Sequence, residues 1–332
     1  MMKIADLLSP LTDSMWHLAK QSGVTHAVSR LPVDNKGQLS WDFMDLLQLK
    51  NKFADSGLRL EVIEPGLDSQ MHNMKLGIEG RDQDIEQCKS LIRNMGALDI
   101  PVLCYNFMAR FNWVRTSVST ITRGGAMVTS YDHRQMKDAP LTEAGVVSQE
   151  RLWDNLKYFM EAVLPVAEDA KVKLALHPDD PPVSSIRGIS RIITSSAAMK
   201  KVINLFPSEY SGITLCQGSL AAAGEDIPAL IREFGHREKI FFVHFRDVRG
   251  KAEEFSETFH DDGQTNMYEA IKAYKEVKFN GPVRIDHVPT MYGEDNHEPG
   301  YSEIGRLFAI GYLKGLLESR DKFEEKLTTA TD

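Results

Sequence analysis

The sequence predicts an α/β protein with the fold of a (β/α)8 TIM barrel. Short apolar and β-branched runs alternate with longer amphipathic segments, and there are eight such runs. The chain has 332 residues, enough for eight β/α units. No repeat, low-complexity tract or Pro/Gly/Ser-rich linker divides it. We therefore expect a single catalytic domain at residues 1–320 and a charged C-terminal tail at residues 321–332.

The eight apolar runs are the expected barrel strands. A nearly continuous apolar run bounded by polar turns is typical of a parallel strand that is covered on both faces. The expected strands are residues 3–8, 25–31, 59–64, 101–107, 172–178, 212–217, 240–248 and 283–288.

The amphipathic segments between these runs are the expected helices. Gly57 and Gly96 follow the first two and are expected to end them, because glycine readily adopts the left-handed conformation found there. Ser195 and Asp226 stand where capping side chains begin a helix. The expected helices are residues 41–56, 82–95, 150–170, 195–205, 225–234, 266–275 and 302–318.

The longest stretch without a regular pattern is residues 110–147. In a barrel this stretch follows the fourth strand at the catalytic end, where long loops often act as lids. We expect it to become ordered only with substrate or a partner present. The rival fold is a doubly wound nucleotide-binding sheet, but the sequence contains neither GxGxxG nor GxxxxGK[ST]. The Gly124-Gly125 pair is instead typical of a flexible turn.

Composition excludes several function classes. The formal net charge is −8, and no basic stretch of five residues occurs, so we expect neither a nucleic-acid nor an anionic-membrane partner. There is no apolar run of about 18 residues and no signal-peptide pattern. Cys88, Cys104 and Cys216 are too few and too scattered for a disulfide framework. We therefore expect a cytoplasmic protein.

Four successive expected strands each carry a metal-binding side chain near the carboxyl end. These residues are His177, Cys216, His244 and Asp286. Because the carboxyl ends of barrel strands converge, the four side chains can share one divalent cation. Their mixture of thiolate, imidazole and carboxylate suits Zn²⁺, Fe²⁺, Co²⁺ or Mn²⁺ better than Mg²⁺ or Ca²⁺. Each alone could be an ordinary buried residue, as we expect for Cys88 and Cys104.

Other polar residues cluster near the same strand ends. Arg246 and Arg284 each lie two positions from a predicted ligand and should share its face of the strand, where either could bind a carboxylate. His260 and Asp262 lie in an acidic loop after the seventh strand, and this loop could instead serve only to cap a helix. The remaining candidates for substrate binding are Asn106, Trp113, Arg115 and Lys75.

With these residues in place, the chain resembles the mannonate dehydratase family of metal-dependent, xylose-isomerase-like TIM barrels. The resemblance spans most of the chain and is densest after residue 174. It rests on the phrases Gly-Arg-Asp at 80–82, Ile-Pro-Val-Leu-Cys-Tyr-Asn-Phe-Met at 100–108, Trp-Val-Arg-Thr at 113–116, Leu-Ala-Leu-His-Pro-Asp-Asp-Pro-Pro at 174–182, Phe-Val-His-Phe-Arg-Asp-Val-Arg-Gly at 242–250, Phe-His-Asp-Asp-Gly at 259–263, Asp-His-Val-Pro-Thr-Met at 286–291 and Gly-Arg-Leu-Phe-Ala-Ile-Gly-Tyr at 305–312.

The resemblance implies an activity and a ligand set. The family's metal ligands fall on the four residues reached from the strand ends, and its metal is usually Mn²⁺. Its reaction removes water from D-mannonate and gives 2-keto-3-deoxy-D-gluconate in hexuronate breakdown. Residues proposed for proton transfer fall on His287 and Tyr301, and barrels of this family commonly form homodimers. Which of the two acts as base and which as acid stays open.

Two points limit the assignment. Strand alternation places Asp286 and His287 on opposite faces, so His287 reaches the site only if the strand bends at its end. The loops containing Arg30 and Arg123 depart from the family pattern, and the same fold could serve a related aldonate. Two further alternatives are a metal-dependent sugar or sugar-acid isomerase or epimerase, and an inactive sugar-acid-binding homologue.

Overall fold

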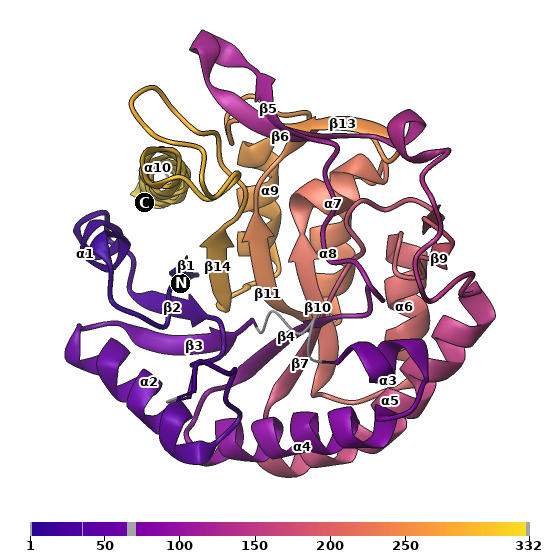
Figure 1. Cartoon of the computed structure of the whole chain (residues 1–332). Coiled ribbons are helices and arrows are strands. Elements are labelled where there is room, and N and C mark those ends of the chain that lie inside the picture. The colour runs from indigo at the N-terminus through magenta and orange to yellow at the C-terminus, as the bar shows by residue number, and fades with distance from the viewer. Residues whose placement is uncertain (1, 35, 65–70, 330–332) are drawn as a thin grey trace.

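Eight parallel strands close into a barrel around which the helices pack (Figure 1). The computed structural model describes residues 2–34, 36–64 and 71–329, with side chains described as far as residue 319. The barrel order is β1, β2, β3, β4, β7, β10, β11 and β14, and β14 pairs with β1 to close the ring. The predicted TIM barrel, and its single-domain character, are confirmed.

All eight predicted strands are present. Two of them, β11 and β14, end three residues earlier than predicted, because the chain leaves the ladder where the polar side chains begin. The barrel strands are β1 (Lys3–Leu8), β2 (His26–Ser29), β3 (Arg59–Ile63), β4 (Val102–Asn106), β7 (Lys173–His177), β10 (Ser211–Cys216), β11 (Ile240–Phe245) and β14 (Pro282–Ile285).

The helices also follow the predicted order, with three additions that the amphipathic pattern was too short to reveal, namely α1, α3 and α7. Ser195 and Asp226 cap their helices as predicted, since each side chain accepts a backbone N–H of the first turn. The helices are α1 (Ser14–Gln21), α2 (Phe43–Asp55), α3 (His72–Leu76), α4 (Arg81–Ala97), α5 (Gln149–Ala170), α6 (Ser196–Leu205), α7 (Gln217–Ala222), α8 (Ile227–His236), α9 (Met267–Glu276) and α10 (Glu303–Thr329).

The two glycines predicted to end helices behave differently. Gly57 follows α2 with a φ of 75°, the left-handed conformation expected after a helix. Gly96 lies inside α4, and the prediction that it ends the helix is wrong. A Cβ at Gly96 would lie 2.4 Å from the carbonyl oxygen of Ala170 at the end of α5. This glycine therefore serves the close approach of two helices rather than the end of one.

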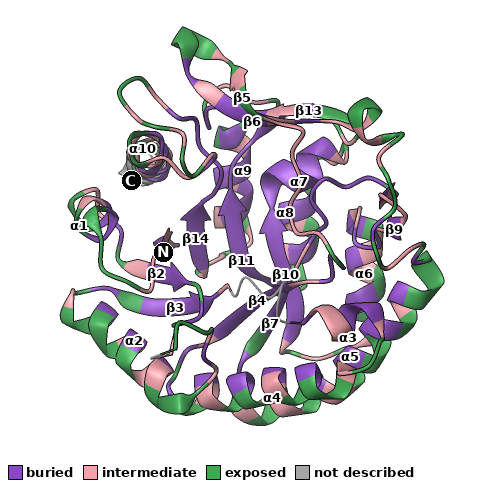
Figure 2. Cartoon of the chain, in the orientation of Figure 1, coloured by how far each residue is buried: buried purple, intermediate pink, exposed green. Residues whose placement is uncertain are grey.

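Apolar residues form two packing layers. The first fills the inside of the barrel with side chains from successive strands, such as Ala5, Val28, Val62 and Phe242. The second lies between the strands and the helices that surround them. Figure 2 shows the result as buried strands and helices whose exposed faces point outward. Both faces of each strand are covered, which explains why the strands are almost continuously apolar.

The predicted irregular loop at residues 110–147 is largely structured, so this prediction is wrong. It contains β5 (Ser117–Ile121), the 3₁₀ turn η1 (Arg123–Gly125), β6 (Met127–Asp132) and η2 (His133–Met136). Strand β6 pairs with β13 (Glu254–Glu257), which pairs with β12 (Val248–Lys251) in one antiparallel sheet. These partners lie over 100 residues away in sequence, so no local pattern could reveal them. A two-stranded sheet, β8 (Ser185–Ile186) with β9 (Ile189–Ser190), completes the strands of the described residues.

The C-terminal part of the chain forms the long helix α10, which continues past residue 320 to Thr329. Part of the predicted tail is thus helical, residues 330–332 lie outside the described residues, and the domain boundary stays a prediction. Within the part of the chain that is described, no helix combines the length and the apolar character needed to cross a membrane.

Candidate active site

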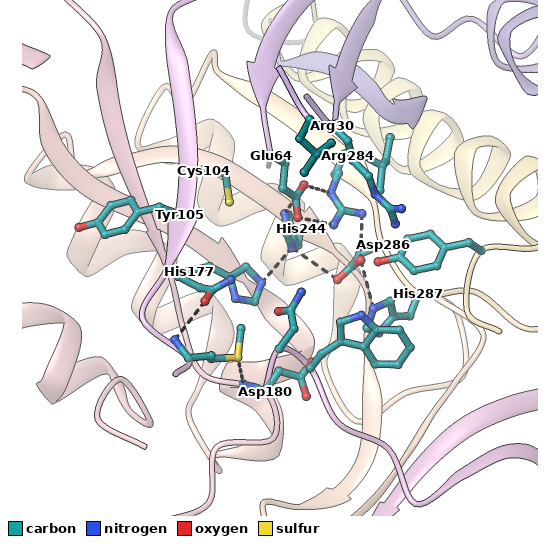
Figure 3. Close-up of a pocket in the computed structure, with 17 residues that line it drawn as sticks. Arg30, Glu64, Cys104, Tyr105, His177, Asp180, His244, Arg284, Asp286 and His287 are labelled. Carbon is teal, nitrogen blue, oxygen red and sulfur yellow. Dashed lines mark hydrogen bonds and ion pairs between the residues drawn. The ribbon is translucent and has the colours of Figure 1, made fainter. Parts of the chain in front are cut away.

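A pocket of about 380 Å³ opens at the carboxyl ends of the barrel strands (Figure 3). This is the end at which TIM-barrel enzymes carry their active sites. Eight of the residues predicted from the sequence line it. They are Asn106, Trp113, His177, His244, Arg284, Asp286, His287 and Tyr301.

Three of the four predicted metal ligands have converging donor atoms. One ligand atom each of His177, Cys216 and His244 lie within 4.8 Å of one another, although the residues come from β7, β10 and β11. The fourth, Asp286, follows β14, and its Oδ2 lies 3.5 Å from Nδ1 of His244 and 4.0 Å from Sγ of Cys216. The structure therefore brings all four side chains together from four neighbouring strands.

The two imidazoles face each other in a way that calls for a cation. Nδ1 of His177 lies 2.6 Å from the carbonyl oxygen of Pro178, so this nitrogen carries a proton and leaves Nε2 with a lone pair. That Nε2 lies 3.1 Å from Nδ1 of His244. Nε2 of His244 faces the carboxylate of Glu64 at 3.4 Å, which favours the proton on that side. Two lone pairs would then meet, and a proton or a metal ion between them relieves the repulsion.

The electrostatics of the site also favour a cation. Burial opposes ionisation of Cys216, but Arg246 and His177 outweigh it and hold the pKa of the thiol well below its usual value. Burial and Arg284 oppose protonation of His244, yet Glu64 and Asp286 raise its pKa well above the usual value. A site that stabilises a thiolate and attracts a proton to an imidazole suits a divalent metal. The donor set therefore fits the predicted cofactor class.

Two other groups in the described residues have metal-ligating atoms close together. Glu64, Cys104 and His244 form one, but burial and the charge of Glu64 raise the pKa of the Cys104 thiol. Asp180, Glu257 and His287 form the other, and arginines already neutralise both of its acids. Cys104 packs inside the barrel as predicted, and it also lines the pocket.

His287 points into the pocket because β14 ends at Ile285, two residues before it. The strand alternation that opposed this placement no longer applies beyond the strand. Nδ1 of His287 lies 2.9 Å from Oε1 of Glu257 and donates to it. Its Nε2 is therefore left with the lone pair, 3.6 Å from Oδ1 of Asp286. The ring of Trp113 packs against the imidazole with 4.6 Å between ring centroids.

Tyr301 packs edge-on against the same imidazole, with 5.3 Å between ring centroids, and it also contacts the Trp113 ring at 6.5 Å. Burial, reinforced by the charge of Asp286, raises the pKa of its phenol well above the usual value. Tyr301 therefore keeps its proton at neutral pH. The pocket thus places a basic imidazole nitrogen and a protonated phenol side by side.

A buried ion-pair network supports this wall of the pocket. Arg246 donates to Asp180 at 2.6 Å and to Glu257 at 2.8 Å, and its Nε lies 2.8 Å from Oδ2 of Asp286. Arg115 forms a two-pronged pair with Asp180 and also contacts Glu257. A Cβ at Gly218 would lie 2.4 Å from the Arg246 guanidinium, so a glycine is needed there. The arginines hold Glu257, which bonds to His287, and Arg246 also contacts Asp286 directly.

Six residues predicted at the site stand outside the pocket wall in the structure. Arg115 and Arg246 lie behind it in the network, and Cys216 lies at the base of the metal group. Lys75 is buried and donates to Asn106. His260 is buried with Nε2 2.7 Å from the carbonyl oxygen of Phe245. Asp262 pairs with Arg249 near the surface. Cys216 was predicted as a metal ligand, and direct substrate contact by the other five stays a prediction without support from the pocket geometry.

Sequence reasoning missed three acids that line the pocket or support its wall. Glu64 directly follows β3, Asp180 follows β7 and Glu257 ends β13. An acid beside an apolar strand was the signal that identified Asp286, and it could have identified Glu64 in the same way. Glu257 gave no such signal, because its strand belongs to the sheet that was not predicted.

The fold and the pocket define a TIM-barrel enzyme whose site lies at the carboxyl ends of the strands. The family model for D-mannonate dehydratase (UxuA) matches residues 12–144 and 139–327. The chain belongs to the D-mannonate dehydratase family, whose members are hydro-lyases.

Relatives agree with this assignment. The chain is 35% identical to the mannonate dehydratase of Thermotoga maritima in an alignment of 340 positions that covers 92% of each protein. It is 36% identical to that of Streptococcus pneumoniae over 325 residues, covering 90% of this chain and 87% of the relative. The crystal structure of mannonate dehydratase from Streptococcus suis serotype 2 superposes with a TM-score of 0.87 at 33% identity, covering 98% and 95% of the two chains. A D-tagatose 3-epimerase-like protein, at 16% identity and a TM-score of 0.63, shares the fold.

Proposed function

We propose that the protein converts D-mannonate, or a closely related aldonate, to 2-keto-3-deoxy-D-gluconate and water, with a divalent cation held by His177, Cys216, His244 and Asp286. The observation that carries the proposal is the pair of imidazole nitrogens 3.1 Å apart beside a stabilised thiolate, in a pocket that also holds His287. We expect a homodimer, located in the cytoplasm, that acts on a small sugar acid.

The cation is expected to be Mn²⁺, with Fe²⁺, Co²⁺ or Zn²⁺ as candidates of similar ligand preference. Bound at these four residues, it supplies Lewis acidity that stabilises negative charge on substrate oxygens. The two arginines that contact Asp286, Arg246 and Arg284, keep its carboxylate aimed at the site.

His287 is proposed as the general base. Glu257 accepts the proton on Nδ1, so Nε2 is free to take the proton from C2 of the substrate, next to the carboxylate. The carbanion that forms is stabilised because its charge spreads onto the carboxylate oxygens. Trp113 and Tyr301 pack on the ring and fix its orientation.

Tyr301 is proposed as the proton donor. Its phenol stays protonated in the buried pocket and can give that proton to the hydroxyl on C3, which then leaves as water. The resulting enol becomes the 2-keto-3-deoxy acid when C3 gains a proton and the C2 hydroxyl loses one. Two neighbouring side chains of opposite protonation thus divide the two transfers.

Arg30 is proposed to bind the acid or the polar hydroxyls of the substrate. It follows β2, lines the pocket and is exposed, and no carboxylate of the described residues pairs with it. Arg284, the other arginine of the lining, is already paired with Glu64 and Asp286. An incoming anion therefore meets Arg30 as a cation that is not yet neutralised.

The test is an assay for 2-keto-3-deoxy acid on metal-stripped protein, with Mn²⁺, Co²⁺, Zn²⁺ or Mg²⁺ added back and D-mannonate compared with other aldonates. We expect product from D-mannonate that depends on Mn²⁺ or a related ion. Product from a different aldonate alone would make that aldonate the substrate, and the loop that contains Arg30 would then account for the changed specificity. An isomerised product that retains all its oxygens would favour the epimerase alternative, and tight metal binding without turnover would favour the inactive homologue.

A further inference from the structure

The two ring nitrogens of His244 face different surroundings. Nδ1 faces Nε2 of His177 at 3.1 Å and Oδ2 of Asp286 at 3.5 Å. Nε2 is buried without a hydrogen bond to any of the described residues, and Oε2 of Glu64 lies 3.4 Å from it, at ion-pair distance, on the opposite edge of the ring (Figure 3). A neutral imidazole has one protonated nitrogen and one lone pair. The partner of Nε2 therefore decides whether the lone pair points toward His177 and Asp286 or away from them.

Glu64 is itself held in place by Arg284. Nε of Arg284 lies 2.9 Å from Oε2 of Glu64, and Nη2 lies 3.0 Å from Oε1. A third nitrogen of the same guanidinium, Nη1, lies 2.9 Å from Oδ1 of Asp286. One arginine thus fixes the acid that faces the outer nitrogen of His244 and also the acid proposed as a ligand.

Glu64 could in principle bind the metal directly, together with Cys104 and His244. The contacts argue against this, because both carboxylate oxygens of Glu64 already accept hydrogen bonds from Arg284. The number of donors also differs between the two edges of the ring. Nδ1 of His244 lies near His177, Cys216 and Asp286, whereas the group that includes Glu64 adds only Cys104 to it. The described residues therefore offer more ligands on the Nδ1 side of His244.

We propose that Glu64 is a positioning residue for the metal site, which accepts the Nε2 proton of His244 and so directs the Nδ1 lone pair toward His177, Cys216 and Asp286. The inference rests on the proposed metal site. Partners of this kind, which bond to the outer nitrogen of a metal-binding histidine, fix its tautomer and ring orientation. Their loss typically weakens metal binding about 10- to 100-fold.

The chain offers a control residue close by. Glu61, in the middle of β3, is an acid paired with Lys3 and Arg59, and it lines a cavity with other residues of the amino-terminal end of the barrel. Glu61→Gln and Glu64→Gln make the same chemical change in two acids that each pair with basic side chains, and Glu61 is the more buried of the two. The variants therefore separate a general cost of losing a buried acid from an effect on the metal site.

The experiment measures the dissociation constants of Mn²⁺ and Co²⁺ by chelator competition, without substrate, for the wild type, Glu64→Ala, Glu64→Gln and Glu61→Gln. Thermal unfolding of each metal-free protein checks folding. We expect about 10- to 100-fold weaker binding for Glu64→Ala. Glu64→Gln should lie between it and the wild type, because the amide oxygen can still accept the Nε2 proton. Glu61→Gln should bind as the wild type does. The thiolate-to-Co²⁺ charge-transfer band should persist in every variant, because Cys216 remains a ligand.

Two results would overturn the inference. Unchanged metal affinity in Glu64→Ala and Glu64→Gln would show that Glu64 does not position His244. A loss far beyond 100-fold, with an altered Co²⁺ ligand-field spectrum, would instead make Glu64 a ligand. If Glu64→Ala fails to fold, Glu64→Gln supplies the same comparison. Failure of the wild type to bind any of these metals would be a failure of the proposed function, and it is distinguishable because it appears before any substitution is made.

Discussion

The two halves of the barrel contribute differently to the pocket. The half formed by β7, β10, β11 and β14 supplies charged side chains that are buried and tied to one another, such as Asp180, Arg246 and Asp286. The half formed by β1 to β4 supplies an exposed Arg30 beside the apolar Leu7 and Leu39, and its charged contribution to the network is Glu64.

This difference suggests that one half of the barrel carries out the chemistry and the other half recognises the substrate. A buried charge network tolerates little change, because removing one partner leaves another charge without compensation. An exposed arginine on the opposite half can be exchanged at little cost to folding. We therefore expect substitutions in the second half to affect turnover, metal binding and stability. Substitutions in the first half should affect substrate affinity, with the exception of Glu64, which we expect to affect metal binding.

The largest effect should come from His287→Ala. Removing the proposed base should lower kcat about 10²- to 10⁴-fold, because that is the usual contribution of a positioned acid or base. Metal affinity should stay close to wild type, since His287 is not a proposed ligand. Steady-state kinetics with D-mannonate measures the change in kcat, and chelator competition measures the metal affinity. A variant with wild-type turnover would remove His287 from the mechanism.

The second largest effect should come from Arg246→Met, which we expect to lower the stability of the fold. This arginine is fully buried and contacts Asp180, Glu257 and Asp286, so its loss leaves buried carboxylates undercompensated. We expect a loss of about 3 to 5 kcal/mol in the free energy of unfolding, measured by denaturant titration.

Arg134→Met is the matched control. Arg134 pairs with Asp132 and Glu254 at an exposed position, and its replacement should leave the unfolding midpoint where it is. Equal destabilisation by the two substitutions would contradict the view that the second half depends on its buried network.

The buried His260 should make stability depend on pH. Burial lowers its pKa to about 4, whereas an unfolded histidine titrates near 6.5. The contribution of His260 to the free energy of unfolding is complete above pH 6.5. It is lost as the pH falls toward 4, because the histidine takes up a proton at higher pH in the unfolded state than in the folded state. The total is about 3 kcal/mol. His260→Gln should flatten the fall in unfolding free energy between pH 7 and 5, and an unchanged slope would show that His260 is not its source.

The smallest effect should come from Arg30→Met, which we expect to change KM but neither kcat nor stability. We expect KM for D-mannonate to rise about 10- to 100-fold with little change in kcat, which corresponds to one charge-assisted hydrogen bond. The KM of Arg30→Lys should lie between those of the wild type and Arg30→Met, and the thermal unfolding temperature should not change in either variant. Inhibition by the uncharged alditol of the same configuration provides a control, because Arg30→Met should affect it less than the acid. A fall in kcat with KM unchanged would place Arg30 in the chemistry instead.

Much of the fold and of the candidate metal site could be predicted from the sequence. Each barrel strand is recognisable as an apolar run, so a polar residue at its end, such as His177 or Asp286, is easily identified. Convergence of strand ends is a property of the fold, so four candidate ligands distant in sequence could be grouped without any structure.

The network behind the pocket could not be predicted. Glu257 and Arg115 meet because β6 pairs with β13 across more than 100 residues, and no local pattern carries that pairing. Arg246 was expected to face a substrate carboxylate, but the carboxylates that it binds belong to the protein itself. Alternation along a strand predicts the face on which a side chain lies. It does not predict which residue or ligand that side chain contacts. His287 shows the same limit, because its direction depends on the residue at which β14 ends.

The most direct test of the central claim is anomalous X-ray diffraction from crystals of the protein loaded with Mn²⁺. The account predicts one strong manganese peak in the pocket, surrounded by His177, Cys216, His244 and Asp286, with Glu64 on the far side of the His244 ring. A peak among Glu64, Cys104 and His244, or among Asp180, Glu257 and His287, would contradict it.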